Sequence, residues 1–365
     1  MPSRAVPIEA VEVAVYVIPT DAPESDGTFE WTSTTLVLVT AYAGGKHGLG
    51  YSYAHRAAAE VVTDTLAPIV RGRNALDVDA SWAAMLHAVR NIGLAGIAAT
   101  AISAVDTALW DLKARLLDVS LVGLLGAVRD GIPVYGSGGF TSYGEPRLRE
   151  QLGKWVAQGI RMMKIKVGRD PAADVARVAT ARDAIGPDAE LFVDANGAYS
   201  RKQALEFAVA FRDYDVTWFE EPVSSDDLEG LRLMRDRGPP GMDIAAGEYG
   251  FDVWYFRRML NAGAVDVLQA DATRCCGISG FLHAGALCET AMVPLSSHTA
   301  PSLHVHLGCA VRRMRHLEWF HDHVRIEQLL FDGALQPEKG ELRPDRSRPG
   351  LGIALKDADA QRYAA

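Results

Sequence analysis

Short apolar runs alternate with helical patterns through most of the chain after Ile132. Eight runs fit buried strands, and in order they read IPVYGS, MMKIKVG, ELFVDAN, VTWFEEP, DIAAGE, AVDVLQAD, MVPLSS and RHLEWF. Strands that alternate with helices pair in parallel, and eight such units close a (β/α)8 TIM barrel. An open doubly wound sheet is the alternative, but its glycine fingerprint is missing here. The pattern predicts an α/β barrel domain over residues 127–335.

The chain before this barrel has the pattern of an α+β capping domain over residues 1–126. The runs VEVAVYVI and TTLVLVTAY predict strands, and helical spacing follows in AAAEVVTDTLAPIV, DASWAAMLHAVRN and residues 96–118. The glycines of GGKHGLG lead into a short strand, so they indicate a hairpin turn and not a phosphate loop. Residues 20–30 are polar and predict a loop, either solvated or a substrate lid. Residues 336–365 are expected to pack back on the first domain.

Composition narrows the class of protein. The chain has 365 residues, 48% of them hydrophobic, and a net charge of -9 without any Lys/Arg-rich run, which argues against nucleic acid as a partner. The four cysteines have neither zinc-site nor disulfide-framework spacing. No leader-like h-region and no run of 18 apolar residues is present. We expect a cytoplasmic protein that acts on a small molecule and not at a membrane.

Three carboxylates follow three successive predicted strands, about one βα unit apart: Asp194, Glu220 and Glu248. Residues at the carboxyl ends of barrel strands converge on one mouth. Three acids brought together there repel one another unless a cation joins them. Hard oxygen ligands suit magnesium better than zinc, which normally recruits His or Cys. The sequence therefore predicts a Mg²⁺ site.

Two lysines and a histidine also lie at or near the ends of predicted strands. Lys164 and Lys166 are two apart on one strand, so their side chains leave on the same face. Burial and mutual repulsion are expected to lower their pKa values and so favour a proton-accepting amine. Asp271 and His298 end the sixth and seventh strands, and an aspartate held against the imidazole would raise its basicity. His304 and His306 are expected to be structural.

Glu318 ends the eighth strand and, if protonated, could donate a hydrogen bond to developing negative charge. Together these residues predict a divalent metal with a lysine base on one wall and a histidine acid/base on the other. Such a site makes the α-proton of a bound carboxylate abstractable, because the positive charge stabilises the enediolate.

The same residues resemble the mandelate racemase branch of the enolase superfamily, over nearly the whole chain. The resemblance rests on the stretch AISAVDTALWDLKARLLDVSLVGLLG and on the motifs KIK at 164–166, DAN at 194–196, EEP at 220–222, GE at 247–248, AD at 270–271, SSH at 296–298 and LE at 317–318. It implies a TIM barrel with an N-terminal capping domain. It also implies a homo-oligomer, from dimer to octamer.

The resemblance implies a role for each site residue. Asp194, Glu220 and Glu248 would bind magnesium, with Glu221 beside them. Lys166 would be one base, and Lys164 would hold the substrate carboxylate. His298, oriented by Asp271, would be the catalyst on the other face, and Glu318 would bond to the enediolate. Asn196 and Ser137 would contact substrate.

The reaction implied first is dehydration of a sugar acid to a 2-keto-3-deoxy acid. A racemase, epimerase or cycloisomerase acting on a 2-hydroxy acid, an amino acid or a sugar-acid lactone is the alternative, and a metal-dependent hydrolase is a more remote one. Specificity would come from residues 20–30 and 51–56. The acids Asp21, Glu24, Asp26 and Glu30 argue against a dianionic substrate if they face the site, and the possible counterweights are His47, His55, Arg56 and Arg274.

Overall fold

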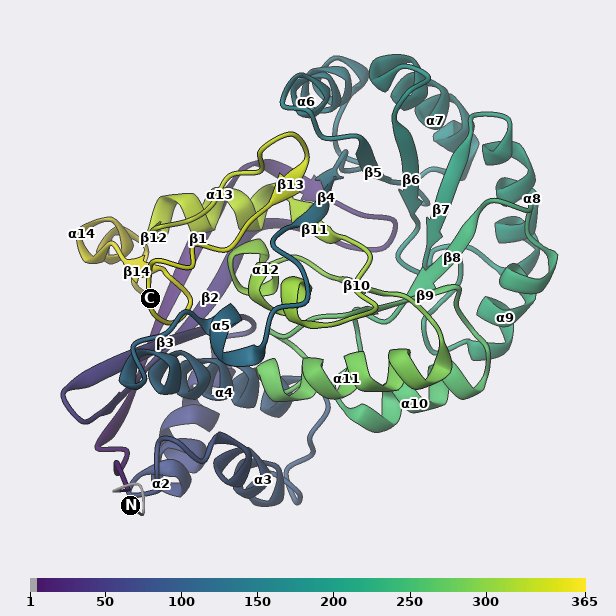
Figure 1. The fold of residues 1–365 in the computed structure, drawn as a ribbon. Coiled ribbons are helices and arrows are strands. Elements are labelled where there is room, and N and C mark those ends of the chain that lie inside the picture. Colours follow the sequence, from purple (N-terminus) through teal and green to yellow (C-terminus); the bar gives the residue numbers. More distant parts are fainter. Residues whose placement is uncertain (1–4) are drawn as a thin grey trace.

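A parallel sheet of eight strands forms the larger part of the molecule. The computed structural model describes residues 5–365. The strand order is β10-β9-β8-β7-β6-β5-β4-β11, and Figure 1 shows the sheet curling round. Hydrogen bonds from Leu295 N to Arg313 O and from Ser297 N to His316 O link β10 to the chain around β11. The strands are β4 (Ile132–Gly138), β5 (Met162–Lys166), β6 (Glu190–Asp194), β7 (Val216–Glu220), β8 (Asp243–Ala246), β9 (Val267–Ala270), β10 (Leu295–Ser297) and β11 (Leu317–Phe320).

Helices follow these strands and cover the outside of the sheet, as Figure 1 shows. They are α6 (Glu145–Ala157), α7 (Pro171–Ile185), α8 (Arg201–Arg212), α9 (Leu228–Arg237), α10 (Val253–Asn261), α11 (Gly277–Ala291), α12 (Pro301–Ala310) and α13 (His321–Leu330). The outward strand side chains and the inner helix faces make one continuous apolar core. All eight runs predicted as strands are strands, which confirms the predicted α/β barrel.

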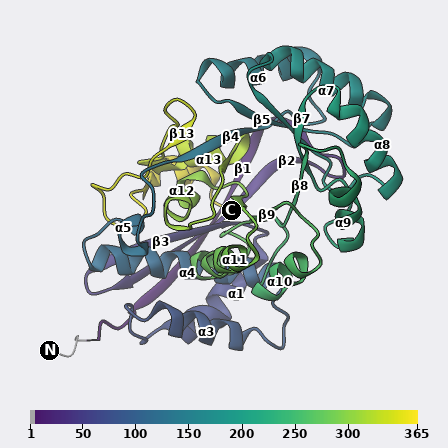
Figure 2. The same cartoon turned by 45° about the vertical axis from the view of Figure 1, so that its right-hand side comes forward.

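The N-terminal part is an antiparallel sheet of three strands with helices on one side. The strands are β1 (Ala10–Ser25), β2 (Glu30–Ala43) and β3 (Lys46–Tyr53). The helices are α1 (Ala57–Val61), a π-helical turn over Val62–Leu66, α2 (Ala67–Val70), α3 (Val78–Ala88), α4 (Ile97–Leu116) and α5 (Leu121–Leu125). Helix α4 packs on β3 and also on α11 of the barrel, as Figure 2 shows.

The loop prediction for residues 20–30 is mostly wrong. Strand β1 continues to Ser25, and after a register shift between Pro19 and Glu24 it pairs again with β2. Only residues 26–29 form the hairpin tip. The residues in this part of β1 are mostly polar, and one face of the strand meets another domain. The apolar periodicity that identifies a strand is therefore weak, so the sequence has the pattern of a loop.

The glycines of GGKHGLG serve turn and packing. Gly44 and Gly45 take positive φ values of 56° and 71° in the β2–β3 turn. A Cβ at Gly50 would lie 2.2 Å from Ala104 O and 2.3 Å from Ala108 N, both in the backbone of α4. The missing side chain therefore sets how closely β3 approaches α4.

Gly50→Ala is expected to destabilise the protein by about 3 kcal/mol, because helix backbone must shift to admit the methyl group. Thermal unfolding should show a fall in Tm of roughly 5 °C or more. Gly153→Ala is the matched control: it lies within α6 with no atom within 4 Å of the added Cβ, so a gain of about 0.5–1 kcal/mol is expected. Equal Tm values for the two variants would contradict this account of the glycine.

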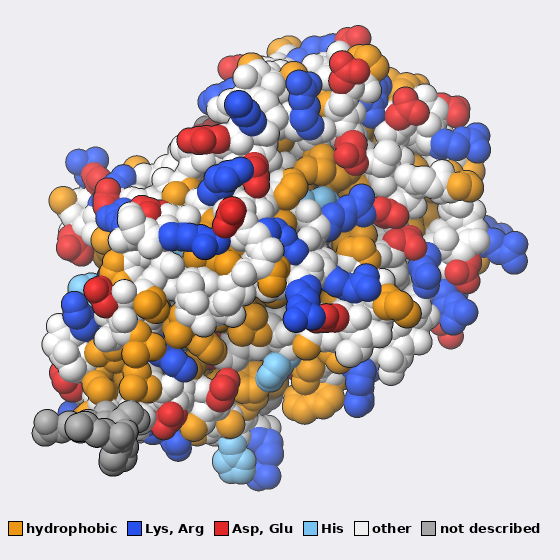
Figure 3. Space-filling model, in the orientation of Figure 1, with side chains coloured by type: hydrophobic (Ala, Val, Ile, Leu, Met, Phe, Trp, Pro, Cys, Tyr) orange, Lys and Arg blue, Asp and Glu red, His pale blue; other side chains and the backbone are white. Residues whose placement is uncertain are grey.

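The C-terminal segment returns to the N-terminal sheet. Strand β14 (Ala354–Leu355) pairs with β12 (Phe331–Asp332), and Ala365 N donates to Val15 O. Strand β13 (Glu341–Leu342) pairs with β4, and α14 (Asp357–Ala360) follows β14. The face shown in Figure 3 carries positive and negative side chains interspersed. None of the helices in residues 5–365 combines the length and apolar character needed to span a bilayer.

Candidate active site

The carboxyl ends of neighbouring strands bring the predicted site residues together. Lys166 on β5 is in register with Asp194 on β6, and Asp194 is in register with Glu220 on β7. Glu248 lies two residues beyond β8, where Gly247 has a φ of 136°. The side chains of Asp194, Glu220 and Glu248 are all buried. Neighbouring parallel strands in register thus deliver these charges to one end of the barrel.

The three carboxylates fit a hard divalent cation. Asp194, Glu220 and Glu248 each offer an oxygen within 4.8 Å of the others. Oε2 of Glu248 is buried and has no hydrogen-bond partner, with His298 Nε2 3.3 Å away. The donors are all carboxylate oxygens, which magnesium prefers. The residues present therefore suit the predicted Mg²⁺.

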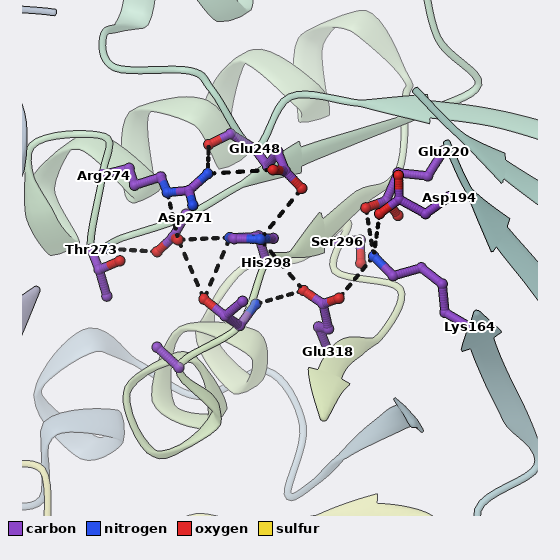
Figure 4. A network of polar contacts seen from close by, with 12 residues as sticks. Lys164, Asp194, Glu220, Glu248, Asp271, Thr273, Arg274, Ser296, His298 and Glu318 are labelled. Carbon is purple, nitrogen blue, oxygen red and sulfur yellow. Dashed lines mark hydrogen bonds and ion pairs between the residues drawn. The ribbon is translucent and has the colours of Figure 1, made fainter. Parts of the chain in front are cut away.

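The two lysines lie against this carboxylate cluster. Lys164 Nζ is 2.5 Å from Glu220 Oε1 and 2.8 Å from Glu318 Oε1, and Lys166 Nζ is 2.5 Å from Asp194 Oδ2. Lys166 also donates to Asn196 Oδ1 at 3.1 Å. Figure 4 shows the Lys164 side chain directed at Asp194 and Glu220.

The prediction of lowered lysine pKa values is wrong for this arrangement. Burial is the largest single influence and lowers the pKa of both lysines, but the carboxylates around each amine, led by Glu220 for Lys164 and by Asp194 for Lys166, together raise it more. Both amines are therefore held in the charged form. The sequence shows the like-charged neighbour two residues away, but it does not show that each ammonium group has its own carboxylate partner.

His298 lies on the opposite side of the cluster and is oriented by Asp271. His298 Nδ1 is 2.8 Å from Asp271 Oδ2, and Figure 4 shows the imidazole between Asp271 and Glu248. Burial raises the pKa of Asp271, but the hydrogen bond from His298 and the nearby positive charges together lower it more, so the net pKa is below its usual value. Thr273 N also donates to Asp271 Oδ1 at 2.7 Å. With Nδ1 held by an ionised aspartate, Nε2 is the ring nitrogen left to exchange a proton.

Two further histidines behave as structural groups. His304 Nε2 accepts from Ala272 N at 2.9 Å, and its Nδ1 lies 2.8 Å from Thr299 O. Burial lowers the pKa of His304, and it lowers that of His306 to about 4. Both side chains are buried and neutral, in agreement with the structural role expected of them.

The prediction that Glu318 donates a hydrogen bond required a protonated carboxyl group, whereas the structure holds this group in its ionised form. Burial raises its pKa, but Lys164, His298 and Lys166 together lower it more, and the net pKa lies well below the usual value. Its Oε2 accepts from Thr299 N at 2.8 Å. In this arrangement Glu318 can accept a hydrogen bond but has no proton to donate.

A cavity of about 480 Å³ lies between the barrel mouth and the N-terminal sheet. Lys166, Asn196, Glu248, Asp271 and His298 line its barrel side. The predicted specificity segments contribute Asp26, Thr28, Phe29, Tyr53, Ala54 and His55, and Arg274 also lines the cavity. His47, Arg56 and the buried Ser137 are not among the lining residues.

Sequence reasoning missed Thr299, Phe320 and His323, which also line the cavity. Rings of His323 and Tyr53 stack with centroids 3.4 Å apart, which joins the end of β3 to the start of α13. The signal was present in part, because Phe320 ends the eighth strand and His323 lies just beyond it, both within a few residues of Glu318. Their contact with a strand from the other domain is not visible in a linear pattern.

The fold and the site define an enolase-type barrel enzyme with an α+β cap. A family model described as enolase C-terminal domain-like matches residues 147–360, and the mandelate racemase/muconate lactonizing enzyme N-terminal domain matches residues 10–126. The chain belongs to this mandelate racemase/muconate lactonizing enzyme family, as its motifs indicated.

Three similar proteins illustrate the family. A mandelate racemase/muconate lactonizing enzyme-like protein from Rubrobacter xylanophilus is 54% identical, with a TM-score of 0.97 and coverage of 98% of this chain and 100% of that one. An L-talarate dehydratase from Polaromonas sp. JS666, solved with Mg and L-glucarate, is 30% identical, with a TM-score of 0.90 and coverage of 99% and 98%. A 3,6-anhydro-alpha-L-galactonate cycloisomerase from Streptomyces coelicolor is 32% identical over 95% of this chain and 97% of its own length.

Proposed function

We propose that this protein is a magnesium-dependent lyase that removes water from a sugar acid to give a 2-keto-3-deoxy acid. The observation that carries the proposal is the placement of two proton-transfer groups on opposite sides of one carboxylate trio. Lys166 bonds to Asp194 on one side, and His298 Nε2 lies 3.3 Å from Glu248 on the other. A substrate held at the trio would then meet one group on each face.

The reaction begins with loss of the proton from the carbon next to the substrate carboxylate. Asp194, Glu220 and Glu248 would hold magnesium, whose positive charge would stabilise the enediolate and weaken the attraction of Asp194 for the Lys166 ammonium group. Once the Lys166 ammonium group has given its proton to solvent, the neutral amine takes the α-proton, and Lys164 helps hold the substrate carboxylate. Glu318, itself ionised, keeps Lys164 and the Thr299 amide in position.

Dehydration then needs an acid on the opposite face. His298 gives a proton from Nε2 to the β-hydroxyl group, the Cβ–O bond breaks as the Cα–Cβ double bond forms, and water leaves. Asp271 stabilises the imidazolium that precedes this step. The enol product becomes the 2-keto-3-deoxy acid when it takes a proton at Cβ.

An isomerase is the second candidate, and a neighbour described as a racemase from Streptomyces coelicolor A3(2) with bound magnesium, 30% identical with a TM-score of 0.92, supports it. Groups on both faces can also remove a proton from one side and return it from the other, which inverts the α-carbon. The same constellation thus supports two outcomes, which differ only in whether a leaving group is present at Cβ.

The test is a panel of sugar acids incubated with Mg²⁺ in D₂O, with keto acid assayed chemically and α-deuterium followed by NMR. Keto acid formed together with solvent deuterium supports the lyase. Deuterium at the α-carbon without keto acid supports the isomerase instead. Neither signal from any member of a broad panel would overturn the proposal.

Three further expectations belong to this proposal. The four cysteines are free and buried, which supports a reducing cytoplasmic location. A homo-oligomer is proposed from the family resemblance, and light scattering tests it. We propose the division into residues 1–126, 127–335 and 336–365; the hydrogen bond from Ala365 N to Val15 O supports packing of the last segment on the first domain, while β13 pairs with β4 of the barrel.

A further inference from the structure

The hairpin tip of residues 26–29 is fixed against the barrel mouth. A Cβ at Gly27 would lie 2.4 Å from Ala195 O and 2.7 Å from Val167 O, so the tip touches the chain just beyond β5 and β6. Thr141 Oγ1 donates to Asp26 O at 2.8 Å and so anchors the tip from the barrel side. The position of Asp26 over the cavity is therefore set by contacts of its neighbours.

Asp26 is buried, and it lines the cavity. Its Oδ1 accepts from Thr28 N at 2.6 Å, Thr28 Oγ1 at 3.1 Å and Phe29 N at 2.7 Å. No hydrogen bond within residues 5–365 involves its Oδ2, although the residue lines the cavity. The turn thus occupies one oxygen and leaves the other for a hydroxyl group.

The other three acids of this hairpin do not reach the cavity lining. Asp21 and Glu30 form ion pairs with residues outside it. Glu24 is fully buried and accepts from the Trp31 indole at 2.9 Å. Asp26 alone among the four acids lines the site, so the charge on the N-terminal side of the cavity is a single negative one.

The cations of the cavity already have anionic partners. In the described chain its lining includes one lysine and one arginine, Lys166 and Arg274. Lys166 is held by Asp194. Arg274 lies 3.5 Å from Glu248 and 3.7 Å from Asp271, over the Tyr249 ring. A second carboxylate at the far end of a substrate would meet no free cation there.

Apart from Asp26, the N-terminal wall has no Asp, Glu, Lys or Arg side chain and mixes hydroxyl groups with aromatic rings. Burial raises the pKa of the Tyr53 phenol well above its usual value, and burial lowers that of the stacked His323 well below. His55 Nδ1 accepts from Ala57 N at 3.2 Å. Thr28 adds a hydroxyl group. These groups suit substrate hydroxyls and not a second anion.

We infer that the substrate is a monocarboxylic polyhydroxy acid of the aldonate class, with Asp26 as the residue that accepts from its distal hydroxyls and rejects a second carboxylate. This inference rests on the proposed function, since it places the single carboxylate at the magnesium trio. Like charges brought together in a partly desolvated cavity repel strongly, so discrimination against the diacid is expected to be large.

The experiment compares aldonates with aldarates that differ only in oxidation of the terminal carbon, such as gluconate with glucarate and galactonate with galactarate. Deuterium exchange and keto-acid formation are measured with Mg²⁺. For the pairs that react, kcat/KM should be at least about tenfold higher for the aldonate. Asp26→Asn should reduce that ratio by roughly 3- to 10-fold, because the asparagine oxygen still accepts from the turn amides while the charge is gone.

Glu30→Gln is the matched control, since it removes the same charge four residues away outside the cavity, and its ratio should equal that of the wild type. An aldarate preferred by the wild-type enzyme overturns the substrate class while the proposed lyase stands. An unchanged ratio in Asp26→Asn overturns the role of Asp26. No exchange with any acid of either class overturns the proposed function, and the inference falls with it.

Discussion

Lys166→Met should abolish α-proton exchange for one configuration at the α-carbon and leave it for the other. Lys166 and His298 contact different members of the carboxylate trio, Asp194 and Glu248, and in the proposed reaction each acts on one face of a substrate bound there. Loss of a positioned acid or base costs roughly 10²- to 10⁴-fold in rate. His298→Asn should show the mirror-image defect, and NMR of a C2-epimeric pair of substrates in D₂O measures both.

Controls separate this chemistry from damage to the fold. Lys202→Met and His87→Asn make the same exchanges at exposed helix positions, and both should retain exchange with either epimer. Lys166→Met also leaves Asp194 with Lys164 at 3.4 Å as a cation, so the buried carboxylate is not left without a partner. Exchange of both epimers by the Lys166→Met/His298→Asn double variant would sink the two-base assignment.

The barrel and its mouth could be predicted because parallel strands convert a linear spacing into a spatial cluster. Once the sheet closes, the polar residue at the end of each apolar run lies at the mouth of the barrel. Asp194, Glu220 and Glu248 lie close together there. The pairing of Asp271 with His298 followed from the same rule, since β9 and β10 are neighbours.

Charge states could not be predicted in the same way. The pKa values of Lys164, Lys166 and Glu318 depend on which oppositely charged atom lies nearest, and that partner belongs to another strand. The hairpin acids illustrate the point further. Four carboxylates close together in sequence reach three different surroundings, because alternate strand residues point to opposite faces. Asp26 lines the cavity because the hairpin contacts the barrel, and the sequence alone does not show that contact.

Magnesium should stabilise the fold as well as support turnover, and Glu220→Gln should remove both effects. At about 100 times its Kd, a ligand that binds only the folded state adds about 2.7 kcal/mol, which corresponds to a rise in Tm of roughly 5 °C. Removal of magnesium with EDTA should reduce turnover to background and reverse that rise.

Glu220→Gln is the informative replacement because its neighbours keep their partners. Lys164 retains Glu318 at 2.8 Å, and the amide oxygen can still accept from the Trp218 indole, which is 2.9 Å from Glu220 Oε2. The variant should therefore fold but show neither the magnesium-dependent rise in Tm nor heat of binding by calorimetry. Glu190→Gln changes an exposed carboxylate at the opposite end of β6 and should keep the full response. A Glu220→Gln variant that binds magnesium with wild-type affinity would show that the trio is not the metal site, because a ligand set reduced to two carboxylates holds Mg²⁺ far more weakly.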